Sequence, residues 1–106
     1  MKYVSKFRLV PGCREEYKRR HDEIWPEMLE LMGTAGIRNY SIWNRGDELV
    51  EYFETDDMET LCAALADSPV KKRWDVYMSD IIRYDTDENG LMTPLTCLFE
   101  FTGKEQ

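Results

Sequence analysis

The amino-acid sequence predicts an α+β domain in which helices cover one face of an antiparallel sheet. Short segments of alternating apolar and polar residues recur along the chain, as strands with one buried face require. Longer segments with apolar residues three or four positions apart lie between them, as amphipathic helices require. The resulting order is strand, helix, strand, strand, helices, strand, which is the split βαβ, ferredoxin-like arrangement.

The first predicted strand runs from Tyr3 to Val10 and alternates along its whole length. Pro11-Gly12 then turns the chain toward the first helix. The residues expected on the better-buried side of this strand are Tyr3, Ser5, Phe7 and Leu9.

A long helical stretch follows, and it contains the only histidine of the chain. Tyr17, His21 and Trp25 are spaced four residues apart, so a helix places them along one face. Pro26 has no amide proton to give to the carbonyl of Asp22, and its ring crowds that carbonyl. The helix is therefore predicted to kink or restart at Pro26.

A hairpin is predicted after this helical stretch, whose end is marked by Gly33 and Gly36. Ile37 to Trp43 and Leu49 to Phe53 are rich in β-branched and aromatic residues. The segment between them, Asn44-Arg45-Gly46-Asp47, contains a glycine suited to a positive φ in the turn.

Two helices are predicted next, each with a capping signal. Thr55-Asp56-Asp57 supplies N-cap candidates for a helix through Ala66, and Glu59 follows Asp56 at the spacing of a capping box. Ser68-Pro69 is a favourable N-cap and N1 pair for the second helix. The inward face expected for this second helix consists of Val70, Trp74, Tyr77, Met78 and Ile81.

The C-terminal part is predicted to be a polar loop from Asp85 to Pro94 and a final strand from Leu95 to Phe101. This strand and Ile37 to Trp43 carry large side chains on both sides. Because a lone sheet of this kind leaves one face uncovered, two protomers are expected to pack face to face as a homodimer.

Length, composition and net charge limit the number of domains and the classes of partner. The chain has 106 residues, 42% hydrophobic and 33% charged, which predicts one globular domain over residues 1–106. The formal net charge of −7 argues against nucleic acid as a partner, because phosphate binding needs clustered positive charge. The basic run Lys71-Lys72-Arg73 is interpreted as a solvated helix face.

Localisation is expected to be cytoplasmic, without a membrane partner. No apolar stretch reaches the ~20 residues that a membrane span requires, and the N-terminal residues lack a signal-peptide core. Cys13, Cys62 and Cys97 are odd in number and form no Cys-x-x-Cys pair, so reduced thiols are expected rather than disulfides or a zinc site.

A metal site is not indicated. Residues Asp85 to Gly90 match the first half of a calcium-binding loop, but the twelfth position is Thr96 instead of glutamate, and Pro94 precedes it. A single histidine cannot build a three-histidine site, and no glycine-rich phosphate loop or nucleophile elbow is present.

His21 is the best candidate for acid/base chemistry, since an ordinary histidine titrates at a pKa of roughly 6.5. The alternative is an ordinary surface or core histidine, the commoner case for a lone histidine on a helix. Aromatic residues with polar tips offer walls for a pocket, although such residues more often belong to the core. The candidate wall residues are Tyr17, Trp25, Tyr40, Trp43, Trp74 and Tyr77.

Three segments together resemble the L-rhamnose mutarotase family. They are Glu16-Tyr17-Lys18-Arg19-Arg20-His21-Asp22-Glu23-Ile24-Trp25-Pro26, Gly36-Ile37-Arg38-Asn39-Tyr40-Ser41-Ile42, and Lys72-Arg73-Trp74 with Tyr77-Met78. The resemblance covers nearly the whole chain and is most specific in the Tyr-x-x-x-His-x-x-x-Trp-Pro run. It implies a dimeric α+β barrel of ferredoxin-like protomers and a cofactor-free enzyme that interconverts the α and β anomers of a monosaccharide.

The resemblance also implies roles for individual residues. His21 falls on the family's catalytic proton donor, and Tyr17, Tyr40 and Trp74 fall on its sugar-binding positions. The family usually has a second tryptophan where this chain has Asp75, which is therefore a further candidate for substrate binding. The family's Asn-Pro-Asp-Asn-Ser-Pro loop is also replaced here, between residues 85 and 94.

The sequence thus predicts a sugar mutarotase, an isomerase that acts on L-rhamnose or a related aldose by general acid/base catalysis. One alternative is a monooxygenase or haem-binding protein on the same dimeric barrel, with the histidine and tryptophans lining its pocket. The other is a dimeric domain that binds a ligand without catalysis.

Overall fold

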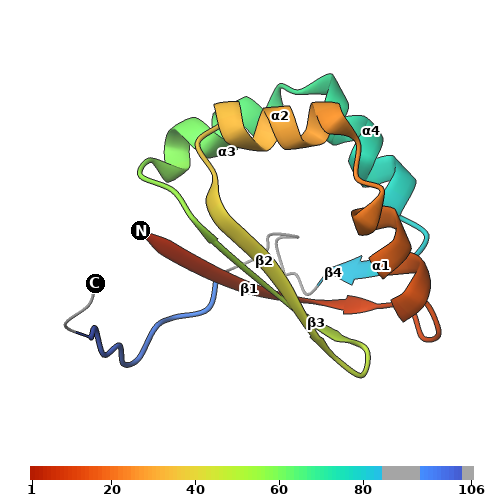
Figure 1. Cartoon of the computed structure of the whole chain (residues 1–106), viewed down its shortest axis with the longest axis horizontal. Helices are drawn as coiled ribbons and strands as arrows, with labels where there is room; N and C mark the ends of the chain where they lie inside the picture. The colour runs from red at the N-terminus through yellow and green to blue at the C-terminus, as the bar shows by residue number, and fades with distance from the viewer. Residues whose placement is uncertain (85–93, 104–106) are drawn as a thin grey trace.

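A computed structural model describes residues 1–84 and 94–103 of the chain (Figure 1). The order of elements agrees with the sequence prediction up to the last strand. The elements are β1 (Lys2–Leu9), α1 (Arg14–Asp22), α2 (Pro26–Thr34), β2 (Arg38–Arg45), β3 (Glu48–Glu54), α3 (Met58–Ala66), α4 (Pro69–Met78) and β4 (Ile82–Tyr84).

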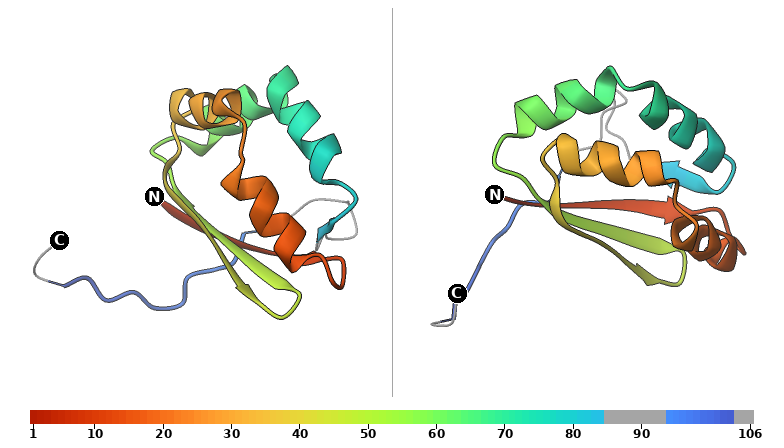
Figure 2. Two further views of the ribbon diagram at one scale, coloured as in Figure 1. Left: turned by 45° about the vertical axis from the view of Figure 1, so that its right-hand side comes forward. Right: turned by 45° about the horizontal axis from the view of Figure 1, so that its top comes forward.

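The four strands form one antiparallel sheet in the order β2-β3-β1-β4. The two central strands are thus the first and third along the chain, as in the split βαβ arrangement. All four helices lie on the same side of the sheet in each view (Figures 1 and 2). The ferredoxin-like α+β prediction is therefore confirmed.

The buried face of the sheet is the one predicted from the alternation in β1. Ser5, Phe7 and Leu9 are all buried, whereas Lys6 and Arg8 between them are exposed. On the neighbouring strand Leu49 lies opposite Phe7 and is only 1% exposed. Phe7, Leu9 and Leu49 pack with side chains of the helices in the main hydrophobic core.

Pro26 separates the first two helices, so the predicted restart is confirmed. Helix α1 ends at Asp22, Trp25 has an extended backbone with φ −62° and ψ 136°, and α2 begins with Pro26 as its first residue. A proline at this position loses no hydrogen bond, because the first amides of a helix have no partner within the helix. The break lets α1 and α2 run in different directions over the sheet (Figure 2).

Capping side chains begin the last two helices. Ser68 caps α4, with its hydroxyl accepting a hydrogen bond from the amide of Lys71 at 3.2 Å. Asp57 caps α3 and accepts one from the amide of Thr60 at 3.1 Å. The capping pair is thus one residue later than the predicted pair of Asp56 and Glu59, because the backbone becomes helical only at residue 58.

The predicted final strand is wrong. The described residues 94–103 contain no strand, and β4 at residues 82–84 pairs with β1 instead. Helix α4 accordingly ends at Met78, before the predicted Ile81. The amide of Leu95 bonds to the carbonyl of Val4 on β1, and the backbone then leaves the body of the domain (Figure 1). Farther along the segment, the ammonium of Lys2 at the start of β1 donates to Glu100 at 2.6 Å.

The apolar alternation in this segment therefore has no partner within the protomer. Leu98 is 93% exposed, Phe99 84% and Phe101 81%. Alternation indicates which side chains share a face, but a strand also needs a neighbour for its backbone groups. Most of the predicted polar loop, including the calcium-like residues 85–90, lies outside the described residues.

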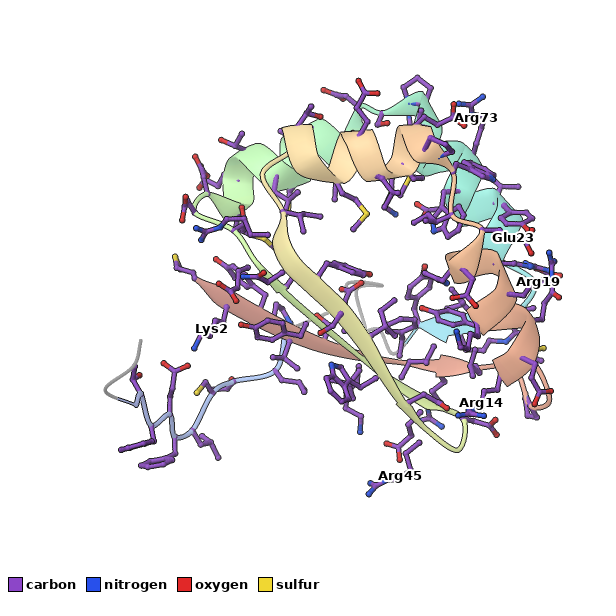
Figure 3. All side chains as sticks on the ribbon, viewed as in Figure 1. Lys2, Arg14, Arg19, Glu23, Arg45 and Arg73 are labelled. Carbon is purple, nitrogen blue, oxygen red and sulfur yellow. The ribbon has the colours of Figure 1, made fainter. Side chains whose placement is uncertain are left out.

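Charged side chains cover the outside of the protomer. Figure 3 shows Arg45 and Arg73 pointing away from the ribbon, whereas Arg14 reaches β2 and donates to Asn44 at 2.6 Å. In the basic run of α4, residues 72 and 73 are exposed as predicted, whereas Lys71 is half-buried. None of the helices within the described residues is long and apolar enough to span a membrane. Cys13, Cys62 and Cys97 are free thiols.

Candidate active site

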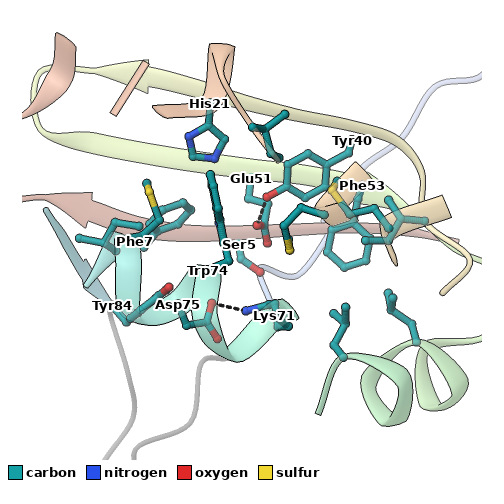
Figure 4. A pocket seen from close by; sticks show the side chains of 18 of the residues that line it. Ser5, Phe7, His21, Tyr40, Glu51, Phe53, Lys71, Trp74, Asp75 and Tyr84 are labelled. Carbon is teal, nitrogen blue, oxygen red and sulfur yellow. Dashed lines mark hydrogen bonds and ion pairs between the residues drawn. The ribbon is translucent and has the colours of Figure 1, made fainter. Parts of the chain in front are cut away.

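A cavity of about 620 Å³ lies between the sheet and the helices (Figure 4). This volume is within the usual range for small-molecule sites. Leucine, isoleucine and methionine side chains make much of its surface apolar. The aromatic and polar residues among its lining are Ser5, Phe7, Tyr17, His21, Tyr40, Glu51, Phe53, Cys62, Lys71, Trp74, Asp75 and Tyr84.

The cavity brings together all five residues that the sequence singled out for a site. Tyr17 and His21 come from α1, Tyr40 from β2, and Trp74 and Asp75 from α4. Three elements that are distant in the sequence therefore line one cavity (Figure 4).

A stack of aromatic rings holds His21 in place. The His21 ring lies 4.3 Å from that of Tyr17, as their i, i+4 spacing predicted, and 5.4 Å from that of Trp74 in an edge-on arrangement. Trp25 and Tyr77 pack on Trp74 with centroids 5.1 and 5.6 Å away and do not line the cavity. Trp25 and Tyr77 therefore hold the Trp74 side chain in place but do not themselves contact the cavity.

Trp43 does not belong to the site, so this candidate wall residue is a wrong prediction. Its side chain is 68% exposed, and its indole donates to the hydroxyl of Ser41 at 3.0 Å. Trp43 is three residues from Tyr40 on the same strand, and an odd separation places side chains on opposite faces. Tyr40 faces the helices and Trp43 faces away from them.

Arg20 fixes α1 against α4 and thereby sets the position of His21 beside Trp74. Its guanidinium donates to the carbonyl of Tyr77 at 2.7 Å and to Asp80 at 2.9 Å, and lies 4.7 Å from the centre of the Tyr77 ring. It also donates to Glu16 at 2.7 Å. These bonds to Arg20 hold the pKa of the Asp80 carboxyl below its usual range.

The histidine ring is oriented by its own helix. Nδ1 of His21 lies 3.1 Å from the carbonyl oxygen of Tyr17, and because a carbonyl only accepts, Nδ1 carries a proton. The neutral ring thus has its lone pair on Nε2. Burial lowers the pKa of His21 below the ordinary value, and the bond to the Tyr17 carbonyl opposes that shift. Nε2 is therefore the ring nitrogen that can give and take a proton.

Tyr40 and Glu51 form a polar pair on the sheet side of the cavity. The phenol of Tyr40 donates a hydrogen bond of 2.5 Å to Oε2 of Glu51. Burial raises the pKa of Tyr40, and the negative charge of Glu51 raises it further, so the phenol stays protonated. Burial likewise raises the pKa of Tyr17.

Glu51 was missed by the sequence analysis. The available signal was its place between Leu49 and Phe53 on β3, since alternate residues of a strand share a face and a lone carboxylate among inward residues is unusual. Asp75, which was predicted, lies at the cavity edge and accepts a hydrogen bond from Lys71.

The described residues that line the cavity form no cluster of metal ligands. Across residues 1–84 and 94–103, no three His, Cys, Asp or Glu side chains come together as metal ligands would. The chemistry that these residues themselves support is proton transfer between His21, hydroxyl groups and carboxylates inside a partly apolar cavity.

Comparison with known proteins decides the family. A model of the L-rhamnose mutarotase family matches residues 2–101. The chain belongs to this family. The resemblance inferred from the sequence is thereby confirmed, and membership makes the chain an isomerase of the sugar mutarotase class, in preference to the monooxygenase and binding-domain alternatives.

Individual relatives agree with this assignment. L-rhamnose mutarotase of Jannaschia sp. (strain CCS1) is 36% identical and aligns with 92% of this chain and 95% of its own. The corresponding protein of Verminephrobacter eiseniae (strain EF01-2) is 38% identical, with 92% and 93% covered.

Solved structures share the fold. The crystal structure of an L-rhamnose mutarotase from Formosa agariphila superposes with a TM-score of 0.77 at 25% identity, covering 96% of this chain and 99% of that one. Tetracenomycin F2 cyclase from Streptomyces glaucescens has a TM-score of 0.71 at 16% identity, covering 97% and 98%. The cyclase supports the fold class only.

Proposed function

We propose that this mutarotase family member interconverts the α and β anomers of L-rhamnose or a related aldose, with His21 as the acid/base group. The observation that carries the proposal is the oriented imidazole of His21 beside Trp74 in a cavity large enough for a monosaccharide. Tyr17, Tyr40, Trp74 and Asp75 are proposed to bind the sugar. The phenols and the carboxylate can bond hydroxyl groups, and the aromatic faces can pack on C–H groups.

The reaction needs two proton transfers. A proton is given to the ring oxygen and another is taken from the anomeric hydroxyl, so that the C1–O5 bond breaks and the open aldehyde forms. Rotation about C1–C2 followed by the reverse transfers closes the ring with the other configuration. A group that can both give and take a proton, such as the imidazole of His21, serves in both directions.

The test is a direct measurement of anomer exchange. NMR saturation transfer between the α and β signals of a panel of free aldoses should show faster exchange with the protein than in buffer alone, most strongly for the physiological sugar. Exchange at the buffer rate for every aldose would contradict the proposed function.

Asp75 is expected to influence which sugar is preferred. It stands where the family usually has a tryptophan, at the edge of the cavity, and a carboxylate can bond hydroxyls but cannot cover an apolar surface. Asp75→Trp should therefore raise activity toward L-rhamnose relative to more hydroxylated aldoses, by the ~1 to 3 kcal/mol that one apolar contact discriminates. The ratio of exchange rates on the two sugar classes measures this effect.

A second variant distinguishes the effect of adding an indole from the effect of losing the carboxylate. Asp75→Asn also breaks the ion pair with Lys71 but adds no apolar surface, so its preference should stay near that of the wild type. An unchanged sugar preference in Asp75→Trp would show that this position does not contact substrate.

We further propose that the protein is a homodimer. The side chains of Leu98, Phe99 and Phe101 are exposed on a segment that leaves the body of the protomer (Figure 1), and the outer face of the sheet carries the exposed Trp43. Exposed large apolar side chains in such numbers indicate an interaction site, and a two-fold dimer is the commonest way to cover it.

Light scattering at micromolar concentration should give the mass of two chains. The double variant Leu98→Ser with Phe101→Ser should shift the protein toward the monomer, because it removes apolar area from the proposed contact. Thr102→Ser, which changes an exposed neighbour, serves as the control. A monomeric wild type would exclude the dimer.

A further inference from the structure

One acidic side chain in the cavity has no assigned role. Glu51 extends from β3 on the helix-facing side of the sheet, directly across from Ser5 on β1 and Ile42 on β2. Of the described residues that line the cavity, only Glu51 and Asp75 are carboxylates. Asp75 is paired with the ammonium of Lys71, whereas the hydrogen-bond partner of Glu51 is the phenol of Tyr40. The charge of Glu51 is thus available to a ligand.

The position of Glu51 complements that of His21. Both side chains reach into the same cavity, His21 from helix α1 and Glu51 from strand β3 (Figure 4). A ligand in that cavity would lie between a helix and the sheet, with the imidazole on one side and the carboxylate on the other. Mutarotation needs one acid and one base at two oxygens of the sugar, and a single imidazole has only one free nitrogen here.

We propose that Glu51 is the second proton-transfer group of this enzyme and acts together with His21. This inference rests on the proposed mutarotase function and extends it to a residue outside the positions carried over from the family.

Besides the fixed Nδ1 proton of His21, the pair holds one proton that can be transferred, and every step conserves it. With His21 as imidazolium and Glu51 as carboxylate, Nε2–H gives its proton to the ring oxygen while Glu51 takes the proton of the anomeric hydroxyl. The electron pair of that O–H bond forms the C1=O double bond, and the pair of the C1–O5 bond stays on O5. The open aldehyde then faces a neutral imidazole and a carboxylic acid, which close the ring on either face by the reverse transfers.

The protonated phenol of Tyr40 has a supporting part in this scheme. Its hydrogen bond holds Oε2 of Glu51, which leaves the other oxygen, Oε1, to receive the sugar proton. The competing explanation is structural: Glu51 could serve only to orient Tyr40 for sugar binding. The two explanations differ in what removal of the Tyr40 hydroxyl does to the rate.

Other titratable side chains line the cavity besides Glu51, and a pH experiment must take them into account. They are Tyr17 and His21 on α1, Tyr40 on β2, Cys62 on α3, Lys71 and Asp75 on α4, and Tyr84 on β4. A limb of the pH profile can therefore be assigned to one residue only by substituting that residue.

The experiment compares the exchange rate and its pH profile in the wild type, Glu51→Gln, Glu51→Asp and Tyr40→Phe, using the best aldose of the panel. A base that acts only as a carboxylate gives wild-type kcat/KM an acidic limb, and loss of the His21 imidazolium gives it an alkaline limb. Glu51→Gln keeps the shape and the acceptor for Tyr40 but cannot take a proton, so kcat should drop about 10²-fold and the acidic limb should disappear.

The two remaining variants separate chemistry from orientation. Glu51→Asp keeps a carboxylate and should retain the acidic limb with a smaller loss of kcat. Tyr40→Phe leaves Glu51 charged and should also keep the acidic limb. If Tyr40→Phe reproduces both the kcat and the profile of Glu51→Gln, the carboxylate only orients Tyr40 and the proposal is wrong.

Failure of the proposal is distinguishable from failure of the function. A wild type that accelerates anomer exchange while Glu51→Gln keeps its full rate and acidic limb overturns only the role of Glu51. A wild type without effect on any aldose overturns the mutarotase function and, with it, this inference. Circular dichroism confirms that each variant is folded.

Discussion

His21→Ala is expected to lower the catalysed rate of anomer exchange by about 10² to 10⁴, the usual contribution of general acid/base catalysis. This corresponds to roughly 3 to 5 kcal/mol of barrier at 1.36 kcal/mol per decade. The variant removes the imidazole that lines the cavity and whose orientation is set by the bond between Nδ1 and the Tyr17 carbonyl. Saturation-transfer NMR, corrected for spontaneous exchange, gives the rate.

The pH dependence of the wild type offers a second check on His21. Because burial lowers its pKa, the imidazolium is lost as the pH rises through a value below the ordinary ~6.5, and the alkaline limb of kcat/KM should begin there. Glu15→Gln, an exposed change on the same helix, should leave rate and profile unaltered. A His21→Ala variant with native circular dichroism and full activity would remove His21 from the mechanism.

Leu49→Ala is expected to destabilise the protein by about 2 to 5 kcal/mol, the range for truncation of a buried leucine. Leu49 is 1% exposed at the centre of the core, between the sheet and the helices, and does not line the cavity. The cost has two parts: lost burial of apolar area and a void that the neighbours only partly fill. Against a typical total stability of about 5 to 15 kcal/mol, this is a large effect.

Urea unfolding at one fixed protein concentration measures the change, because association would otherwise alter the apparent stability. Val76→Ala is the matched control: Val76 is 74% exposed on α4, and its truncation should change stability by no more than about 0.5 kcal/mol. Equal destabilisation by the two substitutions would show that the core is not centred on Leu49.

Local interactions explain why much of the fold was predictable. The Ser68 cap, the break at Pro26 and the turn at Gly46, whose φ is +59°, each depend on a residue and its near neighbours along the chain. The i, i+4 spacing likewise places Tyr17 beside His21 without any tertiary contact.

The sequence by itself determined the class of fold, the helix that presents His21 and, through its motifs, the family. Only the tertiary structure decided that Glu51 enters the cavity, that Trp43 faces outward, and that residues 95–101 leave the protomer instead of completing its sheet. Periodicity fixes which side chains share a face of a strand or helix, because it is a property of the local backbone. Which face becomes a cavity, a core or an exposed surface depends on contacts between segments far apart in the chain, and these are set only when the whole domain packs.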